Sequence, residues 1–149
     1  MMSEGSIRLM THGDIDRVME VEIDAFTSPW TKEIFENELT LNHYAHYIVY
    51  ELEDRIVGYC GFWLIAGEAQ ITNIAIHSSA RGKKRGEELL GAAIALIKGM
   101  GGTKVSLEVR ESNVVAQGLY QKFGMKKGGI RKNYYQDNAE DAWVMWVDF

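Results

Sequence analysis

A carboxylate stands in the middle of a short β-prone run. Residues 104–109 read KVSLEV, in which Val105, Leu107 and Val109 alternate with polar residues that include Glu108. A strand packed between two helical layers is usually apolar on both faces, so Glu108 indicates that one face opens onto a cleft. A carboxylate that is partly shielded from solvent in a cleft can have a raised pKa, which suits it to act as a general base. The same alternation also fits an edge strand with Glu108 in solvent.

A second candidate is a basic, glycine-containing junction between a predicted strand and a predicted helix. Residues 71–90 read ITNIAIHSSARGKKRGEELL. The backbone N–H groups of a loop and of a helix N-terminus bind phosphate, and Gly82 and Gly86 allow close approach. The run matches neither the Walker pattern nor the dinucleotide-binding pattern. On its own it is either an anion-binding loop or a solvated basic turn.

The other reactive residue types give weaker signals. Tyr120 shares a helical face with apolar neighbours, so its spacing fits a core tyrosine as well as a proton donor. Asn113 stands where that helix begins and fits an N-cap. Cys60 lies in an apolar β-prone run and is expected to be a buried, inert thiol. The four histidines show no metal-ligand spacing, so no metal site is predicted.

The elements that position these residues alternate between strand and helix. Glu22, Ile23 and Phe26 are placed on the buried stripe of the first helix, and Asp54 and Arg55 at a hairpin turn. We expect a mixed sheet with helices on both faces. The patterns predict strands at 6–10, 44–52, 56–65, 70–76, 104–109, 125–134 and 142–149, and helices at 14–26, 32–39, within 82–98 after a loop, and at 113–123.

Length, composition and charge narrow the class of protein. The chain has 149 residues, 46% of them hydrophobic and 25% charged, which fits one soluble domain. The N-terminus has no secretory pattern, no run is long enough to span a membrane, and a single cysteine favours a cytoplasmic location. Residues 1–75 carry a net charge of −9 and residues 76–149 one of +4. This asymmetry fits a cationic partner for the first half and an anionic one for the second, or chance.

Taken together, the motifs resemble the GNAT superfamily of N-acetyltransferases and, within it, the bacterial ribosomal-protein-alanine N-acetyltransferase (RimI) family. The resemblance covers nearly the whole chain in four ordered segments: EIDAFTSPWT, ITNIAIHSSARGKKRGEELL, LEVRESNVVAQGLYQKFGM, and IRKNYY with EDAWVMW. It implies a single domain over residues 1–149 with an α/β fold, built as a mixed sheet of about seven strands flanked by about four helices.

The resemblance also implies a site. Glu108 would be the general base and Tyr120 the general acid, with acetyl-CoA as the acetyl donor. Two positions depart from the family pattern. Lys84 stands where the motif Gln/Arg-x-x-Gly-x-Gly/Ala has its first glycine, and Gly118 interrupts the small-residue pattern before Tyr120. The implied cofactor-binding residues are Ile74, Ala75, Ile76, Gly82, Lys83, Lys84, Arg85, Gly86, Glu87 and Asn113.

The implied reaction is direct acetyl transfer to the N-terminal amine, an alanine, of a small-subunit ribosomal protein. An acetyltransferase acting on lysine or a small amine is the alternative, and a CoA-binding module without catalysis is a third. No nucleic acid or membrane is expected as a partner, and the oligomeric state is left open. The residues expected to wall the acceptor site and favour a basic peptide are Glu20, Glu22, Asp24, Phe26 to Trp30, Tyr134 and Tyr135.

Overall fold

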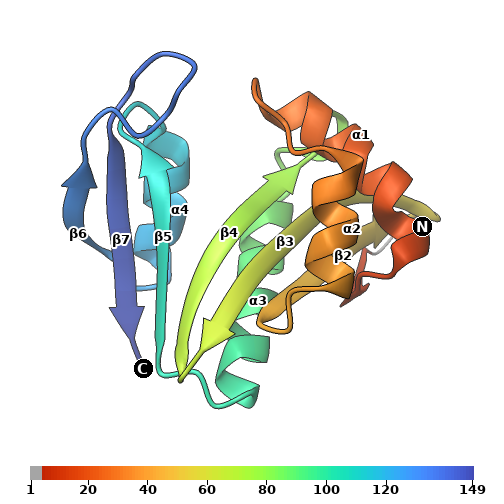
Figure 1. Ribbon diagram of the computed structural model, residues 1–149, viewed down its shortest axis with the longest axis horizontal. Helices are drawn as coiled ribbons and strands as arrows, with labels where there is room; N and C mark the ends of the chain where they lie inside the picture. Colours follow the sequence, from red (N-terminus) through yellow and green to blue (C-terminus); the bar gives the residue numbers. More distant parts are fainter. Residues whose placement is uncertain (1–4) are drawn as a thin grey trace.

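The computed structural model describes residues 5–149, so the first four residues of the predicted domain lie outside the described residues. The elements follow the predicted order (Figure 1). The strands are β1 (Ser6–Leu9), β2 (Ala45–Leu52), β3 (Arg55–Ile65), β4 (Glu68–Ile76), β5 (Lys104–Arg110), β6 (Lys126–Arg131) and β7 (Ala142–Asp148). The helices are α1 (Ile15–Ala25), α2 (Lys32–Thr40), α3 (Arg85–Gly99) and α4 (Val114–Lys122).

The strands form one seven-stranded sheet in the order β1-β2-β3-β4-β5-β7-β6. Within residues 5–149, only β4 and β5 pair in parallel, and they do so over Glu68–Gln70 and 104–106. Beyond these residues the two strands separate, and Figure 1 shows the sheet opening into a V between them. The mixed sheet is thus confirmed. The gap between β4 and β5 lies beside the predicted site residues Ile74 to Ile76 on β4 and Glu108 on β5.

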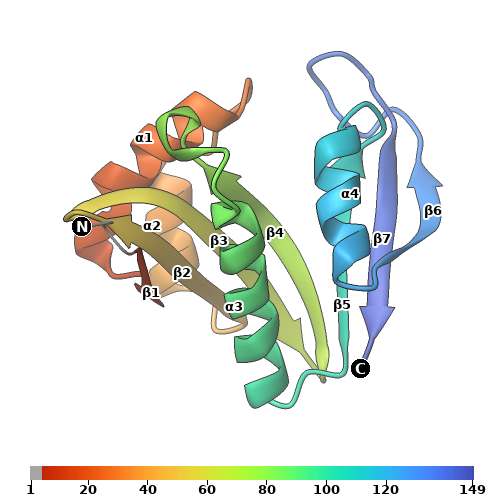
Figure 2. The same ribbon diagram turned by 180° about the vertical axis from the view of Figure 1, so that it is seen from behind.

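Helices cover both faces of the sheet, as expected. Figures 1 and 2 show α1 and α2 on one face and α3 and α4 on the other. The α1–α2 side has a core that includes Val18, Phe35 and Tyr59. The opposite side has a larger core that includes Leu89 and Leu107. The larger core contains residues of β2, β3 and β4 and also of β5 and β7, so it packs against both halves of the V.

Two local predictions were wrong. On α1, Ile23 is 62% exposed and Phe26, which follows the helix, is 36% exposed, whereas Val21 is fully buried. Ile23 follows buried Glu22 by one residue, a rotation of about 100° that turns it toward solvent. The β2–β3 turn consists of Glu53 and Asp54, both with positive φ, and not of Asp54 and Arg55. Such a two-residue turn matches the twist of the strands it joins.

Candidate active site

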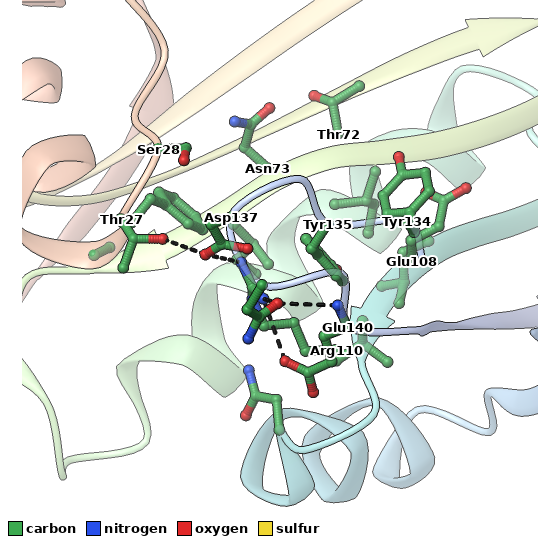
Figure 3. Close-up of a pocket in the computed structure, with 18 of the residues that line it drawn as sticks. Thr27, Ser28, Thr72, Asn73, Glu108, Arg110, Tyr134, Tyr135, Asp137 and Glu140 are labelled. Atoms are coloured by element: carbon green, nitrogen blue, oxygen red, sulfur yellow. Dashed lines mark hydrogen bonds and ion pairs between the residues drawn. The ribbon is translucent and has the colours of Figure 1, made fainter. Parts of the chain in front are cut away.

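A cleft of about 610 Å³ lies where β4 and β5 diverge. Its walls are the end of α1 with the following loop, the middle of β4, the end of β5, the start of α4 and the β6–β7 loop. Figure 3 shows polar side chains from these segments pointing toward one another. Segments distant in sequence therefore contribute to one cavity, which is the arrangement expected of a binding site.

Glu108 lies in this cleft on a strand that is interior to the sheet. Its strand β5 lies between β4, with which it pairs over residues 104–106, and β7, with which it pairs along its whole length, so the edge-strand alternative is wrong. The Glu108 side chain is only 11% exposed. Gln70 Nε2 lies 3.2 and 3.4 Å from its two carboxylate oxygens, and Arg131 Nε lies 3.1 Å from one of them. The carboxylate is thus oriented by one neutral and one charged donor.

Tyr120 reaches the same cleft from α4. The residue is 6% exposed, and this burial, more than the neighbouring Cys60 and Tyr135, raises the pKa of its hydroxyl. A phenol with a raised pKa stays protonated at neutral pH and is available as a proton donor. Its helix α4 is preceded by Asn113, whose side chain accepts a hydrogen bond from the N–H of Ala116 at 3.1 Å. Asn113 therefore caps the helix and also lines the cleft.

The start of α3 has the features of an anion site. Lys84 precedes the helix, and the first intrahelical bond runs from the N–H of Glu88 to its carbonyl. The N–H groups of Arg85, Gly86 and Glu87 come before that bond and have no acceptor within the helix. No side chain caps this end, and the helix dipole adds partial positive charge there.

The backbone of the α3 loop explains the departure from the family motif. Lys84 adopts φ 57° and ψ 24°, the left-handed conformation that glycine takes most easily. Gly82 has φ +92°, and an added Cβ there would meet no other atom within 4 Å. Lys84 thus adopts a conformation that favours glycine, the residue of the family motif at this position. Lys83 and Lys84 are both exposed, so each adds its charge at the surface of the loop.

The end of β4 offers a free backbone edge. Cys60, Tyr59 and Gly58 of β3 pair with residues 74–76 on one side, whereas the described pairing with β5 ends at Gln70. Neighbouring residues of a strand direct their backbone N–H and C=O groups to opposite sides. Because the His77 N–H donates to the Val57 carbonyl of β3, the backbone N–H and C=O of Ile76 point away from β3, toward the gap between β4 and β5. Arg81 Nε donates to the Ile76 carbonyl at 2.9 Å. The Ile76 N–H faces the open side of the V.

Arg110 organises the β6–β7 loop and was missed by the sequence analysis. Its guanidinium contacts Asp137 at 2.9 Å and Glu140 at 3.2 Å, and it stacks 3.9 Å from the centre of the Tyr135 ring. Thr27 Oγ1 donates to Asp137 at 2.7 Å, which connects the loop after α1 to the β6–β7 loop (Figure 3). These partners are 27 to 110 residues apart in sequence, so no spacing pattern could have indicated them.

Tyr134 and Tyr135 line the cleft, as predicted for an acceptor wall. β6 ends at Arg131, earlier than expected, and leaves both tyrosines in the following loop. Their rings contact each other edge to face at 5.1 Å between centroids. Tyr134 is 45% exposed, so its ring is accessible to a ligand.

The acidic residues of α1 do not line the cleft. Glu22 is 1% exposed, accepts hydrogen bonds from the Tyr59 hydroxyl and the Trp30 N–H, and has a pKa raised by burial. Asp24 accepts bonds from the N–H and the hydroxyl of Ser78, both at 2.7 Å. Both carboxylates hold neighbouring loops in place, because each satisfies backbone donors that would otherwise lack a partner. Glu20 is exposed outside the cleft.

The cleft nevertheless has a negative lining from other residues. Glu108, Asp137 and Glu140 line it, and Arg110 is the only basic residue among the described lining side chains. A cationic ligand is therefore favoured there by charge. Within the described residues, no group of three His, Cys, Asp or Glu side chains could hold a metal ion. Cys60 is fully buried, which raises the pKa of its thiol to about 12.

Known proteins share this fold. Residues 15–125 match the sequence pattern of the Acetyltransferase (GNAT) family. The chain belongs to this family. GNAT acetyltransferases use acetyl-CoA as the acetyl donor, and a solved GNAT structure from Elizabethkingia anophelis has acetyl-CoA bound. That structure has a TM-score of 0.81 at 22% identity over 97% of this chain and 98% of its own, and so shares the fold.

Two GNAT relatives are more similar in sequence. A Bacillus subtilis protein named "Putative ribosomal protein bS18-alanine N-acetyltransferase" is 54% identical, covering 99% of this chain and 97% of that protein. The crystal structure of the ribosomal-protein-S18-alanine N-acetyltransferase of Escherichia coli has a TM-score of 0.90 at 25% identity, covering 97% of this chain and 94% of the other. Among the described residues, no helix is long and apolar enough to cross a membrane.

The backbone at Gly82 gives a first testable prediction. Gly82→Val should weaken acetyl-CoA binding by about 5- to 150-fold, because a β-branched residue at φ +92° costs on the order of 1–3 kcal/mol. Gly118→Ala is the matched control, since this exposed helical position has space for a methyl group. Isothermal titration with acetyl-CoA measures both. Equal affinity for the wild type and Gly82→Val would exclude the α3 loop in its present conformation as the phosphate site.

Proposed function

We propose that this protein transfers the acetyl group of acetyl-CoA to the N-terminal amine of a protein that begins with alanine, a small-subunit ribosomal protein. The observation that carries the proposal is the position of Glu108 in an acidic cleft, beside the open edge of β4. The names of the Bacillus and Escherichia relatives support the choice of acceptor.

Two groups of residues would hold acetyl-CoA. The free edge of β4 at Ile74, Ala75 and Ile76 suits the amide-containing pantetheine arm, since an extended chain can pair with an open strand edge. The uncapped start of α3 suits the pyrophosphate. The residues proposed to bind acetyl-CoA at the start of α3 are Gly82, Lys83, Lys84, Arg85, Gly86 and Glu87. Asn113, which precedes α4, would contact acetyl-CoA from the opposite side of the V.

Bound acetyl-CoA would supply the thioester acetyl group. An N-terminal amine has a pKa of about 7.7–8.0, so much of it is already neutral at cell pH, and Glu108 would accept the remaining proton. Tyr120 would donate a proton to the departing sulfur, because its buried hydroxyl remains protonated. The Ile76 N–H, which points into the gap, would stabilise negative charge that develops on the acetyl oxygen.

The acceptor would enter between Tyr134 and the loop after α1. Phe26 and Tyr134 provide partly exposed aromatic surface there. Asp137 and Glu140 add negative charge to the wall formed by the β6–β7 loop. A peptide that is basic just behind its free amine is therefore the favoured acceptor. In this proposal, the acidic residues that select the acceptor lie on β5 and the β6–β7 loop and not on α1.

Matched peptides test the acceptor. A peptide beginning with alanine and rich in arginine should be acetylated at its N-terminal amine about 10-fold faster at low salt than one rich in glutamate. The difference should shrink as salt rises, since exposed charges are screened within about 10 Å at 0.1 M ionic strength. Initial rates with mass spectrometry of the products measure both effects. Acetylation confined to an internal lysine would reject this proposal in favour of the lysine-directed alternative.

The acceptor in the cell can be identified separately. N-terminal peptides from cells with and without the protein are compared by mass spectrometry. The expected difference is the loss of acetylation on one alanine-initiated ribosomal protein. Unchanged N-termini on all ribosomal proteins would exclude that class of acceptor.

A further inference from the structure

Two side-chain oxygens on adjacent residues of β4, Thr72 Oγ1 and Asn73 Oδ1, are buried and have no hydrogen-bond partner within residues 5–149. Both residues line the cleft that contains Glu108 (Figure 3). The Thr72 hydroxyl can rotate and can donate or accept, whereas an amide oxygen can only accept. Buried polar atoms are nearly always hydrogen-bonded in folded proteins. An unpartnered amide oxygen in the wall of a cleft therefore indicates that the ligand supplies the donor.

A β-bulge places Asn73 in this wall. The register of β4 against β3 shifts by one residue at Thr72, which is an extra residue directly before Asn73. Bulges change the direction of side chains and are frequent beside active sites. The pairing of β4 with β5 ends at Gln70, which is opposite Ser106. Along two parallel strands this register puts Thr72 and Asn73 about level with Glu108, on the other side of the gap.

The amide of Asn73 is held from behind by a row of buried polar groups. Burial is the main cause that raises the pKa of the Tyr59 hydroxyl, and a hydrogen bond from the Asn73 side chain opposes this rise. An amide lowers the pKa of a phenol as a donor, so its nitrogen faces Tyr59 and its oxygen is left without a partner. The Tyr59 hydroxyl donates in turn to Glu22, whose other oxygen accepts from the Trp30 N–H at 2.7 Å. Residues outside the cleft thus orient the Asn73 oxygen.

We infer that Asn73 binds the acceptor amine by accepting one of its N–H groups, and that Tyr59 and Glu22 are positioning residues behind it. This inference rests on the proposed function and adds a residue to its acceptor site. A neutral primary amine has two N–H groups and one lone pair. Once Glu108 has accepted the ammonium proton, one N–H donates to Asn73. The lone pair is then free to attack the thioester carbon of acetyl-CoA at the open edge of β4.

Replacing the amide tests the contact directly. Asn73→Leu removes the oxygen and keeps the approximate size of the side chain. It should lower kcat/KM for an alanine-initiated peptide by about 10- to 150-fold, the range expected for a hydrogen bond to a charged group. Affinity for acetyl-CoA, measured by isothermal titration, should stay within about 2-fold of the wild type. Asn73→Ala should give the same loss and is the second variant if leucine prevents folding.

A double variant separates a positioning role from a general loss of stability. Tyr59→Phe alone should lower kcat/KM by about 5-fold, because the Asn73 amide loses the group that orients it. In the Asn73→Leu background the same change should have no further effect, because the oxygen that it orients is absent. Tyr47→Phe is the matched control. It also removes a buried hydroxyl that donates to a carboxylate, that of Glu38 at 2.7 Å, but Tyr47 lies outside the cleft and the variant should keep its kcat/KM.

The wild-type enzyme distinguishes failure of this inference from failure of the proposed function. Absence of acetylation at the N-terminal amine of the peptide by the wild type would overturn the proposed function. If the wild type acetylates that amine but Asn73→Leu keeps its kcat/KM, Asn73 does not bind the acceptor. Losses that multiply in the double variant, or an equal loss of acetyl-CoA affinity in Asn73→Leu, would also overturn the inference. A loss confined to the acceptor and absent from Tyr47→Phe would support it.

Discussion

Glu108→Gln should lower kcat by about 10²–10⁴-fold, the usual contribution of a general base. The substitution keeps the size of the side chain and removes its negative charge, so the residue can neither accept a proton nor form the ion pair with Arg131. Gln70 and Arg131, which hold the carboxylate at 3.1–3.4 Å, lie on the acceptor face and not at the proposed phosphate loop. Affinity for acetyl-CoA should therefore change little. Steady-state rates from pH 6 to 9 and isothermal titration measure the two quantities.

Glu111→Gln is the matched control. Glu111 follows the same strand by one residue, is exposed, and does not line the cleft. It should retain the wild-type kcat. If Glu108→Gln also retained its kcat across the whole pH range, Glu108 would have no part in proton transfer and the cleft would need another base.

The two donors that contact the Glu108 carboxylate, Arg131 and Gln70, differ in charge. Arg131 is 56% exposed and pairs with a carboxylate that is only 11% exposed, so an incoming ammonium group competes with the guanidinium for the same oxygens. Gln70 is neutral and donates to the two carboxylate oxygens, at 3.4 and 3.2 Å.

The sequence predicted the elements better than it predicted the cleft. Alternation within residues 104–110 and the apolar faces of the helices depend on neighbours close in sequence, and the structure reproduces them. Glu108 was recognisable because a polar residue interrupts a strand that should be apolar on both sides. Whether that strand lay inside the sheet depended on pairing with β7, more than 30 residues away, which no local pattern reveals.

The residues missed by the sequence share one property. Arg110, Asp137 and Thr27 meet only because the V brings the end of α1 opposite the β6–β7 loop. The prediction for Glu22 was wrong in the opposite way, because a residue that was expected to line the acceptor site lies outside the cleft. Its position on the buried stripe was correct, but its expected place on the acceptor wall was not, because its carboxylate is turned inward to hydrogen bonds from the Tyr59 hydroxyl and the Trp30 N–H that permit burial. Local patterns therefore identified candidate groups, whereas tertiary contacts decided which of them share the cleft.

Tyr120→Phe should lower kcat by about 10²-fold, because the departing sulfur would lose its proton donor. The phenyl ring keeps the apolar contacts of a residue that is 6% exposed, so the fold should be retained. Burial raises the pKa of Tyr120 above its ordinary value near 10, and the hydroxyl is then protonated throughout pH 6–9. The loss of rate should therefore be the same at both ends of that range.

Tyr44→Phe is the control for this prediction, since Tyr44 is 55% exposed and lies outside the cleft. Thermal unfolding of each variant shows whether a lost rate reflects lost structure. The pH dependence gives the sharper test. A raised tyrosine pKa keeps the proton on the oxygen as pH increases, so a rate difference that vanished by pH 9 would mean that Tyr120 already ionises there. Such a result would contradict its role as the proton donor, because the wild-type enzyme would then have no advantage over phenylalanine.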